Sequence, residues 1–239
     1  MYHWESKGIS VDILFSQAGV SQSVLITADQ TRLLVDCGDG VLRDLRQRNI
    51  RPASLDAIAI THGHFDHMGG LYTLLGYMRM VGRSKTLPII APEGCGESEY
   101  LVKALSDSYA DSIGFAIDRQ SAERVTSIGD MRIESFPVVH CGSIAGAEVL
   151  AQIPAVGYRI THGDSVVAIT GDTGMCDGVR QLVNGVDLAI IEATFPDDWD
   201  IAPEMTERVH LTEKLAKELG STAREYTLVH KIVKIPDET

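Results

Sequence analysis

The chain has 239 residues, with 21 Lys or Arg and 33 Asp or Glu, so its formal net charge is −12. This length is typical of one β-rich or α/β domain, and we expect a single domain over residues 1–239. With 44% hydrophobic and 23% charged residues, the composition excludes a chain that is mostly disordered. The acidic balance argues against a protein that coats duplex nucleic acid, because such proteins need Lys and Arg to neutralise phosphates.

Short β-rich runs alternate with turns and helical stretches along the chain. In chain order, strands are predicted at Val11–Ser16, Ser23–Thr27, Leu33–Asp36, Leu55–Thr61, Leu87–Ala91, Phe115–Ile117, Arg124–Ile128, Met131–Val139, Ala155–Thr161, Val166–Thr170, Val186–Ile191 and Tyr226–Val229. Helices are predicted at Val41–Arg48, Leu71–Val81, Glu97–Tyr109, Cys176–Val183 and Thr212–Leu219. This order favours two sheets packed together with helices outside.

We expect a cytoplasmic protein with no membrane partner. The first residues lack a basic start followed by a long apolar core. The longest apolar stretches fall short of the about 20 residues that cross a bilayer. Four widely spaced cysteines, none in a CxxC pair, are most simply interpreted as reduced, buried thiols; they are Cys37, Cys95, Cys141 and Cys176.

The strongest pattern for chemistry follows a predicted buried strand, where the sequence reads His-Gly-His-Phe-Asp-His, an HxHxDH run. His62 and His64 are two residues apart on an extended chain, so both project to the same side and can hold one metal ion. Asp66 and His67 lie at the turn into the next helix and can hold a second ion. The run therefore predicts a site for two metal ions.

Two metal ions need more ligands than this run supplies. His140, Asp172 and His230 each follow a predicted strand, and side chains at strand ends gather at one edge of a sheet. A lone histidine after a strand is more often structural; beside the HxHxDH run, His140 and Asp172 are favoured as ligands, and both interpretations stay open for His230. His162, in a predicted hairpin turn, is interpreted as structural, and His3 has no supporting context.

These residues resemble those of the metallo-β-lactamase-fold hydrolases and, among them, ribonuclease Z and its short relatives. The similar segments are Leu34–Gly40, His62–Gly69, Pro137–His140 with Gly157–Arg159, Gly171–Thr173, Glu192–Phe195 and His210–Thr212. The HxHxDH loop is common to the whole superfamily, whereas the last two segments resemble motifs of the ribonuclease Z branch. The resemblance implies an α/β (α+β) fold, the four-layer αβ/βα sandwich of the metallo-β-lactamase fold.

The resemblance also implies two Zn²⁺ ions, with Mn²⁺ or iron as alternatives. It implies one ion on His62, His64 and His140, a second on Asp66, His67 and His230, and Asp172 as the bridge between them. Two metal ions can activate a water and stabilise charge on a phosphoryl group. The catalytic residues that it implies are Asp66, Glu192 and His210, with Glu192 and His210 as an acid/base pair that protonates the leaving oxygen. A homodimer is likewise suggested by the resemblance alone.

Two segments depart from the ribonuclease Z pattern. That family inserts a long Lys-rich arm, which grips tRNA, between the third histidine and the bridging aspartate. Here the interval is 172 − 140 = 32 residues, and its loop Cys141–Pro154 contains no Lys or Arg. After the last histidine, Lys231–Lys234 stands where the family usually has Ser and an Arg-Tyr pair. We therefore predict a metal-dependent phosphodiester hydrolase for small phosphodiesters or short RNA, without an extensive nucleic-acid grip.

Several other functions remain as alternatives. A ribonuclease Z-type tRNA 3′-processing endonuclease has the same motifs in its favour and the missing arm against it. Hydrolysis of thioester or lactone substrates is a second alternative, although a glyoxalase II would need a C-terminal helical domain and a secreted β-lactamase would need an export signal. A non-enzymatic metal-binding homologue is the third; loss of ligands would indicate it, and no ligand position is obviously lost.

Overall fold

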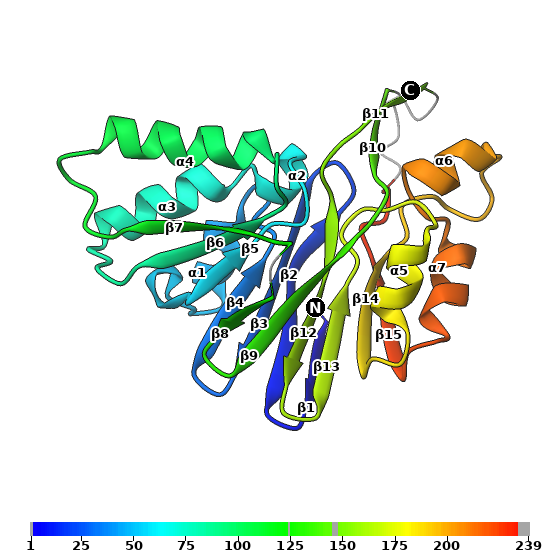
Figure 1. The fold of residues 1–239 in the computed structure, drawn as a ribbon, viewed down its shortest axis with the longest axis horizontal. Helices are drawn as coiled ribbons and strands as arrows, with labels where there is room; N and C mark the ends of the chain where they lie inside the picture. The colour runs from blue at the N-terminus through cyan, green and yellow to red at the C-terminus, as the bar shows by residue number, and fades with distance from the viewer. Residues whose placement is uncertain (1, 124, 145–147, 234–239) are drawn as a thin grey trace.

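The computed structural model describes residues 2–123, 125–144 and 148–233. The strands in these residues are β1 (His3–Ser6), β2 (Ile9–Gln17), β3 (Ser21–Ala28), β4 (Thr31–Val35), β5 (Ala57–Ala59), β6 (Leu87–Ala91), β7 (Ile117–Ser121), β8 (Thr126–Ile128), β9 (Met131–Pro137), β10 (Cys141–Ile144), β11 (Glu148–Gln152), β12 (Val156–His162), β13 (Ser165–Ile169), β14 (Leu188–Glu192) and β15 (Glu225–Val229). The helices are α1 (Val41–Gln47), the 3₁₀ turn η1 (Pro52–Ser54), α2 (Phe65–Met68), α3 (Leu71–Met80), α4 (Gly96–Ser108), α5 (Asp177–Val183), α6 (Pro203–Arg208) and α7 (Glu213–Gly220). Figure 1 shows two facing sheets with helices on the outer sides, and β10 and β11 as a separate hairpin at the upper edge.

The first sheet has the strand order β1-β2-β3-β4-β5-β6-β7. Its pairs are antiparallel from β1 to β4 and parallel from β4 to β7. Helices α1, α3 and α4 cover its outer face (Figure 1). In α3, the buried residues Leu71, Leu74, Leu75 and Met78 have the spacing of one helix face, so they form the stripe that packs on the sheet.

The second sheet has the order β15-β14-β13-β12-β9-β8. Its pairs are antiparallel from β8 to β13, and β14 and β15 continue it in parallel. Helices α5 and α7 bury Leu182 and Leu219 against its outer face. The predicted start of α7 is confirmed, because the side chain of Thr212 accepts a hydrogen bond from the backbone N–H of Leu215 at 3.2 Å.

The main core lies between the sheets. Val24 and Val35 from the first sheet and Ile169 and Ile190 from the second belong to one buried cluster. Tyr158 crosses this core, and its buried hydroxyl donates a hydrogen bond to the carbonyl of Ile60 at 2.7 Å. The layers therefore follow the predicted order of helices, sheet, sheet and helices. None of the helices in the described part of the chain has the length and hydropathy needed to cross a bilayer.

The prediction of an irregular loop between β9 and β12 was wrong. The predicted loop Cys141–Pro154 contains a β-hairpin, in which β10 and β11 pair antiparallel. Val149 of β11 packs against an apolar cluster that includes Met205 of α6, and this distant contact gives the hairpin its support. The strand expected at Phe115–Ile117 begins at Ile117, as β7. Arg124 and Lys234, which were part of predicted segments, lie outside the described residues.

Candidate metal centre

The predicted metal-binding residues meet at one edge of the sandwich. His62, His64 and α2, with Asp66 and His67, follow β5, and α2 and the β10–β11 hairpin lie at the upper edge in Figure 1. The other members lie beyond the last residues of β9, β13 and β15, and they are His140, Asp172 and His230. Strands that end at the same edge bring residues far apart in sequence into one site.

The side chains form two groups that share one aspartate. The first group is His62, His64, His140 and Asp172, and the second is Asp66, His67, His230 and Asp172. Within each group, the candidate ligand atoms all lie within 4.8 Å of one another. The structure therefore brings all seven residues together, His230 included, in the two groups that the family resemblance implies.

Asp172 lies between the groups. Its Oδ2 is 3.7 Å from His62 Nε2 and 3.9 Å from His140 Nε2. Its Oδ1 is 3.2 Å from His67 Nε2 and 3.3 Å from His230 Nδ1. Each oxygen thus faces one group, which is the arrangement needed of a carboxylate that bridges two cations.

Three buried polar atoms at this point form no hydrogen bond of acceptable geometry with the described residues. They are His62 Nε2 and both carboxylate oxygens of Asp172. Asp172 has histidine nitrogens nearby but no hydrogen bond on either oxygen; burying a carboxylate in this state is costly, and coordination of a metal ion is one way to offset that cost. Nitrogen and carboxylate oxygen ligands in fours also suit zinc. The residues present therefore fit a pair of metal ions.

The histidines of the first group are held in the neutral form that binds metals. Burial lowers the pKa of His140 from 6.5 to about 3, and it lowers the pKa of His62 and His64 as well. His140 Nδ1 donates a hydrogen bond to the carbonyl of Val209 at 2.8 Å. That bond leaves the lone pair of His140 on Nε2, the atom that faces the group.

A buried carboxylate, that of Asp36, lies behind His67, and no role was predicted for it. His67 Nδ1 donates to Oδ2 of Asp36 at 2.8 Å, so the lone pair of the neutral ring lies on Nε2, toward the second group. Burial lowers the pKa of His67, but the charges of Asp172 and Asp36 outweigh it and raise the pKa well above 6.5. Oδ1 of Asp36 also accepts the backbone N–H of Thr61 at 2.8 Å. The position of Asp36 directly after β4 was the available signal.

Glu192 and His210 form the predicted pair beside the cluster. Oε1 of Glu192 lies 3.2 Å from His210 Nδ1, and Nδ1 in turn lies 3.9 Å from Oδ2 of Asp172. Burial lowers the pKa of His210, but the charges of Glu192 and Asp172 outweigh it, and the net shift is upward. Glu192 is itself buried and accepts the backbone N–H groups of Thr173 and Leu211 at 3.2 and 3.0 Å, so its carboxylate is fixed in place.

Thr194 is a second residue without a predicted role. Its hydroxyl lies 3.0 Å from Oε2 of Glu192, 3.3 Å from His210 Nδ1 and 3.0 Å from His230 Nδ1. It thus connects Glu192 and His210 to the second group. Its place in the Glu-Ala-Thr-Phe segment was the sequence signal.

His162, which was interpreted as structural, lies at the end of β12 away from the cluster, with its Nε2 at 3.6 Å from Oδ2 of Asp29.

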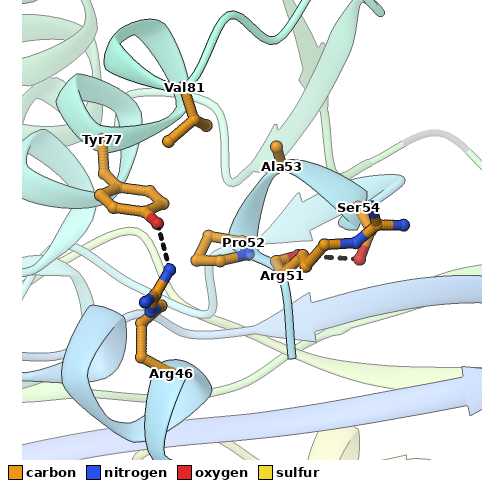
Figure 2. A pocket seen from close by; sticks show the side chains of 7 residues that line it. All are labelled: Arg46, Arg51, Pro52, Ala53, Ser54, Tyr77 and Val81. Carbon is orange, nitrogen blue, oxygen red and sulfur yellow. Dashed lines mark hydrogen bonds between the residues drawn. The ribbon is translucent and has the colours of Figure 1, made fainter. Parts of the chain in front are cut away.

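A separate pocket of about 360 Å³ lies between α1, η1 and α3. Figure 2 shows Arg46 at one wall, where its guanidinium donates a hydrogen bond to the hydroxyl of Tyr77, and Arg51 beside Ser54. None of its lining residues belongs to the predicted site, so it is a feature distinct from the metal-ligand cluster.

Comparison with known proteins agrees with this architecture. The model of a family described as the β-lactamase superfamily domain matches residues 31–230. Ribonuclease Z of Mycobacterium bovis (strain BCG / Pasteur 1173P2) is 28% identical over 178 residues, which cover 70% of this chain and 62% of that protein. Ribonuclease Z of Pyrobaculum calidifontis (strain DSM 21063 / JCM 11548 / VA1) is 29% identical over 239 residues, which cover 87% of this chain and 79% of that protein.

A solved structure has the same fold. The metallo-β-lactamase fold protein YhfI from Bacillus subtilis superposes with a TM-score of 0.74 at 22% identity, over 95% of this chain and 87% of that chain. The predicted fold class is thereby confirmed. The chain spans about 62% of the length of the Mycobacterium bovis relative. Because the family match extends over most of the chain and the fold agrees with it, the chain belongs to the β-lactamase superfamily, as a ribonuclease Z-like protein with the metallo-β-lactamase fold.

Proposed function

We propose that this chain is a metal-dependent hydrolase that cleaves phosphodiester bonds. The observation that carries the proposal is the Glu192–His210 pair, 3.2 Å apart, with His210 Nδ1 at 3.9 Å from the shared carboxylate of Asp172. A proton donor at the edge of a two-metal cluster suits the departure of an alkoxide from a phosphodiester, because an alkoxide is a poor leaving group until it is protonated.

The metals that we propose are two zinc ions. The residues that would hold them are His62, His64 and His140 on one side, Asp66, His67 and His230 on the other, and Asp172 between them. When bound, such a pair supplies a Lewis acid for the phosphoryl oxygens and a nucleophile at neutral pH. The donor sets and the unpartnered atoms of His62 and Asp172 support this assignment.

The proton needed by the leaving group would come from His210. Its Nδ1 faces Glu192, so in the imidazolium form the second proton is on Nε2, the ring nitrogen free of that contact. Asp66 would act on the other side as an ionised carboxylate. Burial raises its pKa, but a hydrogen bond with His230 and the charge of His67 outweigh burial, so the net shift is downward. The backbone N–H of Gly19 donates to Asp66 at 2.9 Å and fixes it further.

The first test is hydrolysis of bis(p-nitrophenyl) phosphate by the zinc-loaded protein. We expect turnover, and we expect Asp172→Ala to abolish it, because both groups lose their shared carboxylate. Asp164→Ala, in the exposed turn between β12 and β13, is the matched control and should retain activity. A fully metallated protein that leaves this substrate intact but hydrolyses thioesters or lactones rapidly would overturn the proposal.

The leaving group gives a second, sharper test. p-Nitrophenolate leaves without a proton, whereas an alkoxide does not. His210→Ala should therefore slow cleavage of a dialkyl phosphodiester far more than cleavage of bis(p-nitrophenyl) phosphate. Equal losses on both substrates would contradict the role of His210 as proton donor.

A ribonuclease Z-type endonuclease is the second candidate, and the similarity to proteins of that name favours it. The absence of Lys and Arg from Cys141–Pro154 opposes it, since binding to an RNA backbone depends on such cations. A precursor tRNA with a 3′ trailer decides between the two: specific removal of the trailer would favour the endonuclease. Size-exclusion chromatography with light scattering tests the homodimer that the resemblance suggests.

A further inference from the structure

The metal-ligand cluster is open on one side. His62, Asp66, His67, His140, Asp172 and His230 are all buried, whereas His64 is only partly buried. His210 is likewise partly exposed, with 15% of its side-chain surface accessible. A substrate therefore reaches the cluster past His64 and His210, and the side chains around these two residues are the first that it meets.

The β10–β11 hairpin presents one face to His64. Ile144 pairs directly with Glu148, so these residues and Leu150 lie on the face opposite Val149. A Cβ placed on Gly142 would lie 3.5 Å from Leu150 and 3.9 Å from Nε2 of His64. The face that carries Leu150 thus borders the open side of the cluster.

Three exposed apolar side chains belong to the hairpin face or to the residue next to His64. Phe65 lies between His64 and Asp66 in the sequence, and 67% of its surface is exposed. On the hairpin, 56% of Ile144 and 40% of Leu150 are exposed. Large apolar side chains left in water at the entrance of a polar site indicate a binding surface.

Two carboxylates near the entrance, those of Glu148 and Glu97, disfavour a nucleic-acid backbone. Glu148 shares the hairpin face with Ile144 and Leu150. On the other side, Glu97 of α4 is close enough to Gly63 that a Cβ there would collide with its carboxylate. Negative charges repel successive phosphates, but they tolerate a neutral aromatic ring next to a single phosphate held at the cluster.

We propose that Phe65, Ile144 and Leu150 form a hydrophobic subsite that holds one aromatic base of a small phosphodiester beside the scissile phosphate. This inference rests on the proposed phosphodiester hydrolysis and specifies its substrate class, a nucleotide with a single phosphodiester. Aromatic and aliphatic side chains hold a base by stacking and by burying it, without reading its sequence.

The test compares two substrates with the same leaving group, thymidine 5′-(p-nitrophenyl phosphate) and methyl p-nitrophenyl phosphate. We expect the zinc-loaded protein to prefer the thymidine substrate. Phe65→Ala should lower the ratio of the two kcat/KM values by about 5–150-fold, the range for loss of one stacking partner, and Phe65→Trp should restore it. Met80→Ala, which removes an equally exposed side chain (68%) from α3, is the control and should leave the ratio unchanged.

A second readout needs no turnover. Calorimetric titration of the zinc-loaded protein with thymidine 5′-phosphate should show weaker binding to the Phe65→Ala and Leu150→Ala variants than to the unaltered protein, with metal content unchanged. No preference for the thymidine substrate, or equal binding by all variants, would overturn the subsite. Failure of the unaltered protein to cleave either substrate would instead count against the proposed function, and the titration would still decide on the subsite.

Discussion

Asp36 provides a strong test of how the second metal group is held. It accepts hydrogen bonds on both oxygens, from His67 Nδ1 at 2.8 Å and from the backbone N–H of Thr61 at 2.8 Å. Asparagine at this position keeps the shape but has only one oxygen. If that oxygen faces Thr61, the amide NH₂ faces His67 Nδ1, which must become an acceptor and move its proton to Nε2. The nitrogen that faces the second group then has no lone pair for a metal ion.

The alternative orientation of the amide is also costly. If the oxygen faces His67, the NH₂ group faces the N–H of Thr61, and a buried backbone donor is left unpaired at about 1–3 kcal/mol. For Asp36→Asn we therefore expect zinc affinity at the second group to fall by about 10–100-fold, the usual effect of removing such a supporting carboxylate. A loss of this size corresponds to about 1.4–2.8 kcal/mol of zinc-binding free energy.

The assay is a zinc titration of the metal-free protein in competition with a chromophoric chelator, together with urea unfolding of the metal-free form. Asp12→Asn is a matched control, because Asp12 also contacts a histidine nitrogen at 2.8 Å, that of His3, but at the surface. Exposed pairs of this kind contribute about 0–1 kcal/mol. If Asp36→Asn binds both zinc ions and unfolds like the unaltered protein, then Asp36 neither sets the tautomer of His67 nor holds the second group in place.

Two further predictions concern the acid/base pair and the backbone. Glu192→Gln removes a carboxylate that raises the pKa of His210. His210 should then lose its proton at lower pH, so the alkaline limb of the kcat/KM profile moves to lower pH; an unmoved limb would show that another group sets it. Gly178→Ala should destabilise the protein, because a Cβ there collides with the backbone carbonyl of Pro137, whereas Gly76→Ala in α3 meets nothing within 4 Å. The latter should stabilise the protein by about 0.5–1 kcal/mol, and urea unfolding of both variants measures the contrast.

The periodic segments of the fold were predictable from sequence because their side chains face one large core. Helix α3 has its apolar residues at helical spacing, and the short buried strand β5 is apolar throughout. The β10–β11 hairpin was not predictable, because its alternation is weak and its support comes from Met205 in α6, which is distant in sequence. Local pattern cannot reveal a strand that is stabilised by such a contact.

The residues of the candidate site likewise fall into those that a local sequence pattern identified and those that it did not. The HxHxDH run identified four residues by itself, since the spacing of His62 and His64 on extended chain already points both rings to one side. His140, Asp172 and His230 could be suggested only as residues after strands. The role of Asp36 was not predicted: its place at the end of a predicted strand was the only sequence signal, and nothing local showed its contact with His67, 31 residues away.

The sequence by itself determined the core segments and the HxHxDH loop, because each depends on residues that are neighbours along the chain. Its composition already suited a folded α/β chain. The sequence also contained the −12 charge, which argues against a protein that coats nucleic acid. Only the tertiary structure decided that Asp172 stands between two groups and that Glu192 contacts His210. These contacts join separate strand ends, and the packing of the two sheets sets the distances between them.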